Sequence, residues 1–120
     1  MRFLVVDDEP SVLLLVSANV RAWGHEVVTA ATVDEARAHC EGGGIDVMLL
    51  DVSMPSMDGP TFLRSLRAAG CEPGRVFLLS AIAPEELERL AADLDVDHIT
   101  KPFTAPGLRD ALLPAIERAS

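Results

Sequence analysis

The sequence predicts an α/β fold, an open parallel sheet with helices on both of its faces. Five short apolar segments rich in β-branched residues recur along the chain, and a segment with helical spacing follows each of them. Strict alternation of this kind is typical of parallel strands that are connected by helices. The segments 2–7, 45–51 and 75–80 are also apolar without alternation, as expected of strands that are covered on both faces.

The five strands are predicted, in order, at residues 2–7 (RFLVVD), 25–30 (HEVVTA), 45–51 (IDVMLLD), 75–80 (RVFLLS) and 97–100 (DHIT). Four helices are indicated by apolar residues three and four positions apart: Val12, Val16, Val20 and Trp23; Phe62, Leu63 and Leu66; Leu87, Leu90, Ala91 and Leu94; and Leu108, Leu112 and Ile116. A weaker helix lies between the second and third strands, and the glycines at 42–44 should end it. Pro114 should kink or end the last helix.

The composition indicates one soluble domain over residues 1–120. Hydrophobic residues make up 49% of the chain, but no apolar run approaches the roughly 18–20 residues that cross a membrane. The FLVV segment is too short for the core of a signal peptide, so we expect a cytoplasmic protein. A net charge of −9 argues against direct binding of nucleic acid by this domain. Cys40 and Cys71 have no metal or disulfide spacing, and we expect both to be reduced.

Polar side chains follow four of the predicted strands where each strand ends. Asp7 and Asp8 follow the first strand, Asp51 the third, Ser80 the fourth and Lys101 the fifth. Open parallel sheets bind ligands outside the carboxyl ends of their strands. We therefore expect these side chains to share one crevice.

Three carboxylates in such a crevice suit a hard divalent cation, and Mg²⁺ is the ion we expect. The ion would offset the repulsion between Asp7 and Asp8. Lys101 and Ser80 suit the oxygens of a phosphoryl group. A carboxylate can itself be a nucleophile, and Asp51, alone on the central strand, is the natural candidate.

Each residue also has a simpler interpretation. Asp8 or Glu9 could cap the first helix, where acids are favoured, and Asp51 could be a turn residue. Ser80 and Lys101, taken singly, are typical of ordinary surface positions. Their joint placement at four strand ends favours a functional site.

Four motifs carry a resemblance to a known family. VVDDEP (5–10), LLDVSMPSMDGP (49–60), LLSAIAPEE (78–86) and ITKPF (99–103) resemble, in order and spacing, the motifs of response-regulator receiver domains of two-component systems. The resemblance covers essentially all 120 residues. It implies a flavodoxin-like (βα)5 three-layer sandwich with strand order 2-1-3-4-5.

The resemblance also implies roles for the site residues. Asp51 would be the phosphoacceptor, phosphorylated by a histidine kinase or a histidine phosphotransfer protein. Mg²⁺ would be bound by Asp8 and Asp51, by Asp7 through water, and by the backbone carbonyl of Ser53. Ser80 would be a switch hydroxyl that turns toward the phosphoryl group, Lys101 would contact a phosphate oxygen, and the Lys101–Pro102 peptide would be cis.

Several positions depart from the family's habit. His98 stands at a switch position that is commonly Tyr or Phe, and Asp95-Val96 replaces the usual Gly-Ala. The stretch from Ser80 to Lys101 is about one residue shorter than usual, so the fourth helix is expected to be short or shifted. These changes bear on the surface formed by the fourth helix, fifth strand and fifth helix, through which the family controls a downstream effector. A phosphorylation-dependent homodimer is left open.

Three functions are compatible with these residues. The first and favoured one is a phosphorylation-controlled switch that does not act on external substrates. Such a switch would still catalyse its own phosphorylation from small donors and its own dephosphorylation. The second is an interaction module that has the fold but does not use phosphate. The third, a Mg²⁺-dependent phosphohydrolase, lacks an acid two residues after Asp51. A dinucleotide-binding function is excluded because the glycines at 42–44 end a helix instead of opening one.

The first helix offers a further expectation about docking. If Val12, Val16 and Val20 face the core, Leu13 and Leu14 fall on another face, beside the acids. They would then belong to the surface that meets the phosphodonor.

Overall fold

The computed structural model describes residues 1–118, in which strands and helices alternate strictly. The strands are β1 (Arg2–Val6), β2 (Glu26–Ala30), β3 (Val47–Asp51), β4 (Arg75–Ser80) and β5 (Asp97–Thr100). The helices are α1 (Pro10–Ala22), α2 (Val33–Glu41), α3 (Gly59–Ala69), α4 (Pro84–Leu94) and α5 (Ala105–Arg118). The predicted elements are therefore all present, with strand limits that differ by at most two residues.

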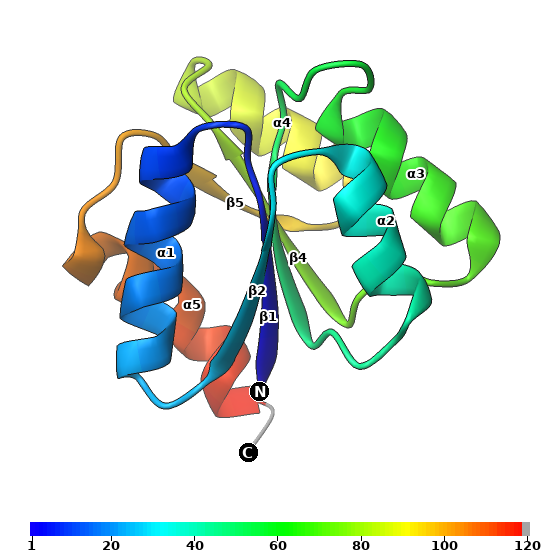
Figure 1. Cartoon of the computed structure of the whole chain (residues 1–120). Helices are drawn as coiled ribbons and strands as arrows, with labels where there is room; N and C mark the ends of the chain where they lie inside the picture. The colour runs from blue at the N-terminus through cyan, green and yellow to red at the C-terminus, as the bar shows by residue number, and fades with distance from the viewer. Residues whose placement is uncertain (119–120) are drawn as a thin grey trace.

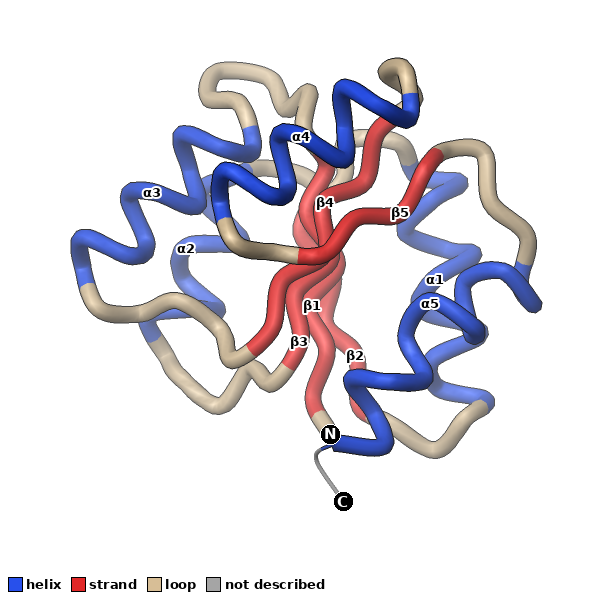
Figure 2. Tube along the Cα trace, turned by 180° about the vertical axis from the view of Figure 1, so that it is seen from behind, coloured by secondary structure: helices blue, strands red, loops and turns tan. Residues whose placement is uncertain are grey.

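The strands form one parallel sheet in the order β2-β1-β3-β4-β5, which confirms the predicted topology. Helices α1 and α5 cover one face of the sheet, and α2, α3 and α4 cover the other (Figure 1). The view from behind shows the same three layers, with β1 and β3 in the middle of the sheet (Figure 2). None of the helices in residues 1–118 has the length and hydrophobicity needed to cross a lipid bilayer.

Alternate residues of the central strands belong to two separate apolar cores. Phe3 and Val5 of β1 pack on the α1/α5 side, whereas Leu4 and Val6 pack on the side of α2, α3 and α4. All four side chains are completely buried. This two-sided burial explains why the sequence of the strand shows no polar alternation. It also means that the position of a residue along a strand decides which face its side chain approaches.

The carboxyl ends of α4 and α5 agree to different degrees with what the sequence predicts. Helix α4 ends at Leu94, and its C-cap residue, Asp95, has a left-handed φ of 56°. Aspartate tolerates this conformation better than most residues. Pro114 was expected to kink or end helix α5; the helix runs through Pro114 to Arg118, so Pro114 does not end it, and the kink stays a prediction. Pro114 and the residue four positions before it, Asp110, are both exposed, so water can bond the carbonyl that loses its amide partner.

Helix α3 begins in direct contact with the end of β3. A Cβ atom added at Gly59 would lie 3.2 Å from the carbonyl carbon of Asp51 and from the Cα atom of Val52, and still closer to the Asp51 carbonyl oxygen. The Gly59 amide also donates a hydrogen bond to the Val52 carbonyl oxygen at 2.9 Å. Glycine at this position therefore lets the helix pack against the backbone of Asp51.

The first prediction follows from this contact. Gly59→Ala should lower the free energy of unfolding by about 2 kcal/mol or more, because backbone atoms cannot give way as a flexible side chain can. Gly42→Ala is the matched control, since its Cβ would meet only ordinary contacts of 3.5 Å or more. Urea denaturation followed by circular dichroism measures both changes. Equal stability of the two variants would contradict the close approach.

Candidate functional site

The carboxyl ends of β1 and β3 bring three acids together at one edge of the sheet. Asp7, Asp8 and Asp51 each offer a carboxylate oxygen that lies within 4.8 Å of the others. Asp7 and Asp51 are buried, whereas Asp8 is exposed. Both sequence segments were predicted to deliver acids to this edge, and the structure places them in one cluster.

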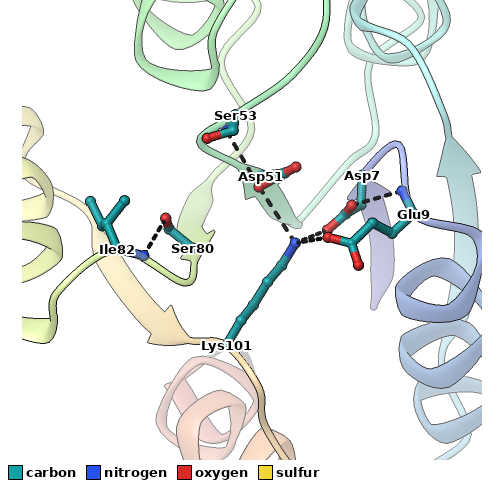
Figure 3. Close-up of polar contacts among 7 residues, drawn as sticks. All are labelled: Asp7, Glu9, Asp51, Ser53, Ser80, Ile82 and Lys101. Carbon is teal, nitrogen blue, oxygen red and sulfur yellow. Dashed lines mark hydrogen bonds and ion pairs between the residues drawn. The ribbon is translucent and has the colours of Figure 1, made fainter.

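The ammonium group of Lys101 lies among these carboxylates (Figure 3). Its Nζ is 2.7 Å from Asp7 Oδ2, 3.2 Å from Glu9 Oε1 and 3.5 Å from Asp51 Oδ1. The side chain of Lys101 is only 11% exposed. Lys101 therefore serves as a counterion inside the cluster of carboxylates.

The two carboxylate oxygens of Asp7 have different surroundings. Oδ1 accepts a hydrogen bond from the Glu9 amide at 2.9 Å. Oδ2 is buried and accepts no hydrogen bond of regular geometry from residues 1–118; its recorded contact is the ion pair with Lys101. A buried carboxylate oxygen with only this one partner can interact with a further cation or with a water bound to one.

Glu9 does not act as the helix cap that the simpler interpretation required. It is the N-cap residue of α1, but its side chain makes no capping hydrogen bond to the helix. The carboxylate instead binds the Lys101 ammonium. This contact joins residues that are 92 positions apart. Sequence reasoning missed it, and only the predicted closeness of the strand ends could have indicated it.

Negative charge exceeds positive charge at this edge, since four carboxylates, including Glu9, surround one ammonium. Burial and then the charge of Asp7 raise the pKa of the Asp51 carboxyl above its usual range, although Lys101 and the Ser53 amide oppose the rise. Burial alone would lower the pKa of the Lys101 ammonium, but its close contact with the Asp7 carboxylate and the charge of Asp51 outweigh burial and raise that pKa. Ionisation of Asp51 is therefore only partly compensated.

The residues fit a hard divalent cation. The three carboxylates supply oxygen ligands only, and one of these oxygens, Asp7 Oδ2, is buried without a regular hydrogen bond. Mg²⁺ prefers oxygen ligands and keeps several of its waters, so a site with few protein ligands suits it. Such an ion would also supply the positive charge that the cluster lacks.

Ser80 approaches the site from the other face of the sheet. It is the last residue of β4 and, by strand alternation, follows Val76 and Leu78, which pack on the side of α4. Its Oγ accepts a hydrogen bond from the Ile82 amide at 3.1 Å (Figure 3). His98 is half-buried in β5 and pairs in register with Leu78. Within residues 1–118, neither Ser80 nor His98 forms a hydrogen bond or an ion pair with Asp7, Asp8 or Asp51.

Two other implied features lie close to Asp51 and Lys101. The Ser53 amide approaches Asp51 Oδ1 at 3.4 Å, which holds the backbone of Ser53 beside the carboxylate. The Lys101–Pro102 peptide bond is cis, the isomer that the family resemblance implies. Both features keep their segments next to the carboxylates.

The expected docking pair, Leu13 and Leu14, was partly wrong. Leu13 is half-buried and packs against the core on the α1/α5 side. Leu14 is 71% exposed and Leu15 is 36% exposed, because the helix turns Leu15 outward instead of Leu13. Leu15 also lines a hollow of about 400 Å³ beside the acids, together with Glu9, Ser11, Val12, Ala81, Lys101, Pro102 and Phe103.

Comparison with known proteins agrees with this geometry. Residues 3–113 match the model of the response regulator receiver domain family. The chain is 34% identical over 120 residues to the alkaline phosphatase synthesis transcriptional regulatory protein PhoP of Bacillus subtilis, covering 99% of this chain and 49% of PhoP. It is 32% identical over 115 residues to the transcriptional regulatory protein KdpE of Mycobacterium tuberculosis, covering 96% of this chain and 50% of KdpE.

Among solved structures, the chemotaxis response regulator CheY4 of Vibrio cholerae superposes with a TM-score of 0.86 at 28% sequence identity, covering 95% of this chain and 97% of CheY4. The chain spans about half the length of the curated relatives PhoP and KdpE. The match to the family model extends over nearly the whole chain and includes every strand and the acidic cluster. This chain therefore belongs to the response regulator receiver domain family.

Proposed function

We propose that this receiver domain is a phosphorylation-controlled switch whose phosphoacceptor is Asp51. The phosphoryl group comes from the phosphohistidine of a histidine kinase or a histidine phosphotransfer protein. The observation that carries the proposal is a buried carboxylate at the end of the central strand, which clusters with the acids that follow β1 and lies 3.5 Å from the ammonium of Lys101. An isolated surface aspartate would have neither partner.

Asp51 acts as the nucleophile in this proposal. One of its carboxylate oxygens attacks the phosphorus, a P–O bond forms, and the P–N bond to the donor imidazole breaks with its electron pair left on the ring nitrogen. The Lys101 ammonium lies 3.5 Å from Asp51 Oδ1. It can therefore contact the phosphoryl oxygens and stabilise the negative charge that they carry during transfer. With acetyl phosphate as donor, the same attack breaks a P–O bond and releases acetate. The domain thereby catalyses its own phosphorylation. In dephosphorylation, water attacks the phosphorus, the P–O bond to Asp51 breaks, and inorganic phosphate leaves while the carboxylate is regenerated.

Mg²⁺ is the proposed cofactor. Asp8 and Asp51 would hold it through carboxylate oxygens, Asp7 through water, and Ser53 through its backbone carbonyl. When bound, the ion neutralises the charge that accumulates on the transferred phosphoryl group. The pKa of Asp51 is raised first by burial and then by the charge of Asp7, and a bound cation would oppose both effects.

Ser80 and His98 carry the proposed response to phosphorylation. Ser80 Oγ is bonded to the Ile82 amide, so a turn of the hydroxyl toward the phosphoryl group releases the loop that leads into α4. His98 lies one strand away, beside Leu78 in register. The half-buried ring is the group that can follow the loop, and the surface of α4, β5 and α5 would present the change to a downstream effector.

The phosphodonor is proposed to dock on the exposed leucines of α1. Leu14 and Leu15 project from the helix that begins directly after the acids, and the hollow lined by Leu15, Phe103 and Lys101 opens at the same edge. A donor helix with apolar residues can cover this surface while its phosphohistidine reaches Asp51. Single exposed leucines are common, but two neighbours beside a reactive carboxylate form a continuous patch.

The second prediction tests the chemistry. Acetyl phosphate should add one phosphoryl group to the domain in the presence of Mg²⁺ and none in EDTA, and Asp51→Asn should acquire none. Intact-mass spectrometry measures the addition. A phosphoryl group retained by Asp51→Asn would contradict the assignment of Asp51. A parent protein that never acquires one would instead favour the interaction module that does not use phosphate.

The third prediction tests docking. Changing Leu14 and Leu15 together to Ser should slow phosphoryl transfer from a histidine phosphotransfer protein about tenfold, since it removes a central apolar contact. Phosphorylation by acetyl phosphate should stay unchanged. Leu113→Ser, at a leucine of α5 that is 38% exposed, is the matched control. Equal losses with both donors would point to damaged folding and would contradict a docking role.

The fourth prediction uses the sign of the Asp51 pKa. A carboxyl whose folded pKa is raised stabilises the fold only below its unfolded pKa, and this contribution is lost as the pH rises through the folded value. At neutral pH in EDTA, Asp51→Asn should therefore raise the free energy of unfolding by on the order of 1 kcal/mol, and the gain should shrink below about pH 4.

Thermal unfolding across this pH range, with and without Mg²⁺, measures the effect. Asp58→Asn is the control, because the Thr61 amide lowers the pKa of that helix-capping carboxyl, so its neutralisation should bring no gain at neutral pH. Loss of stability in Asp51→Asn at neutral pH would contradict the excess of negative charge at the site.

A further inference from the structure

Glu9 is the acid of the first motif that the proposed function does not use. In the part of the chain that the structure describes, the carboxylates able to share a metal ion are those of Asp7, Asp8 and Asp51, without Glu9. The Glu9 side chain is 58% exposed, and its Oε1 lies 3.2 Å from Lys101 Nζ. The Glu9 side chain thus contacts the cluster through Lys101 and is not one of the carboxylates of the candidate metal site.

Lys101 lies against the carboxylate oxygen of Asp7 that faces the candidate metal site. Its Nζ is 2.7 Å from Asp7 Oδ2, the buried oxygen without a regular hydrogen bond. The other oxygen, Asp7 Oδ1, is already bonded to the Glu9 amide. An ammonium held at Oδ2 repels a divalent ion that binds beside it, whether the ion meets Asp7 directly or through water. A shift of Lys101 away from Asp7 therefore favours binding of the ion.

We propose that Glu9 is a positioning residue that holds Lys101 against Asp7 in the phosphate-free domain and thereby weakens Mg²⁺ binding. The inference rests on the proposed function, since it assumes that Mg²⁺ binds at Asp7, Asp8 and Asp51. Glu9 contributes from outside the metal site: its carboxylate and that of Asp7 contact the same ammonium from neighbouring positions (Figure 3).

The length of the Glu9 side chain allows this positioning role to be distinguished from a purely electrostatic effect of its negative charge. A negative charge near a cation site should strengthen Mg²⁺ binding, so neutralising Glu9 should weaken it. If Glu9 instead holds the competing ammonium in place, loss of the Glu9 contact should strengthen Mg²⁺ binding. Glu9→Asp keeps the charge but is one methylene shorter, and it therefore loses the contact with Lys101 while it retains the electrostatic attraction.

The experiment measures Mg²⁺ dissociation constants by isothermal titration calorimetry at constant ionic strength. Glu9→Asp should bind Mg²⁺ about two- to fivefold more tightly than the parent, the range expected for loss of a partly exposed ion pair. In the Lys101→Met background, Glu9→Asp should leave the dissociation constant unchanged. Glu9→Gln should tighten binding less than Glu9→Asp with Lys101 present, and should weaken binding when Lys101 is Met.

Glu86→Gln removes one negative charge from the first turn of α4, at the same edge of the sheet, and is the matched control. It should weaken Mg²⁺ binding slightly in both backgrounds. A Glu9→Asp dissociation constant equal to that of the parent, or a Glu9→Gln change that is the same with and without Lys101, overturns the inference alone. A parent domain that binds no Mg²⁺ overturns the metal site of the proposed function together with it.

Discussion

Crowding of like charges at the end of two adjacent strands is the constraint on which this site depends. Asp7 and Asp51 are buried, and neither can be solvated as a surface carboxylate is. Lys101 compensates part of their charge by ion pairs to both. The ammonium is fixed in turn by the end of β5 and by the contact with Glu9. Because one cation serves several anions, the cluster stays short of positive charge. Under the proposed function, a divalent ion makes up this deficit and so allows an anionic phosphoryl group to enter the site.

The pleat of the sheet sorts the site residues into two groups. Asp51 follows Val47 and Leu49, and Lys101 follows Ile99, so both approach from the α1/α5 side. Ser80 has the opposite parity and is directed toward α4, where it bonds the Ile82 amide. The charged groups and the hydroxyl therefore belong to different packing environments, although all of them stand at the same edge. Gly59 closes the arrangement by allowing α3 to pack directly on the backbone of Asp51.

The fold could be predicted almost completely from the sequence because its signals are local. Each strand is a short apolar run, each helix has its own periodicity, and strict alternation leaves few topologies. The residues at the strand ends could be predicted for the same reason. The contact of Glu9 with Lys101 could not, because it depends on the conformation of two long side chains from distant segments. The exposed pair is Leu14 and Leu15 instead of Leu13 and Leu14, a shift of one residue along the helix, and apolar spacing alone does not fix the exposed face this finely. Pro114 does not end α5 because it and Asp110 are exposed, so water can bond the carbonyl that loses its amide partner.

The division of the site by the pleat has a consequence for how such a domain can diversify. The exposed leucines of α1 and the hollow beside them lie on the side of Asp7, Asp51 and Lys101, whereas Ser80 and His98 lie toward α4. Under the proposed function, substitutions near Leu14 and Leu15 would change the encounter with the phosphodonor, and substitutions near Ser80 and His98 would change the response to phosphorylation. Helix α5 is the element that the two share, because it packs against α1 and belongs to the proposed output surface.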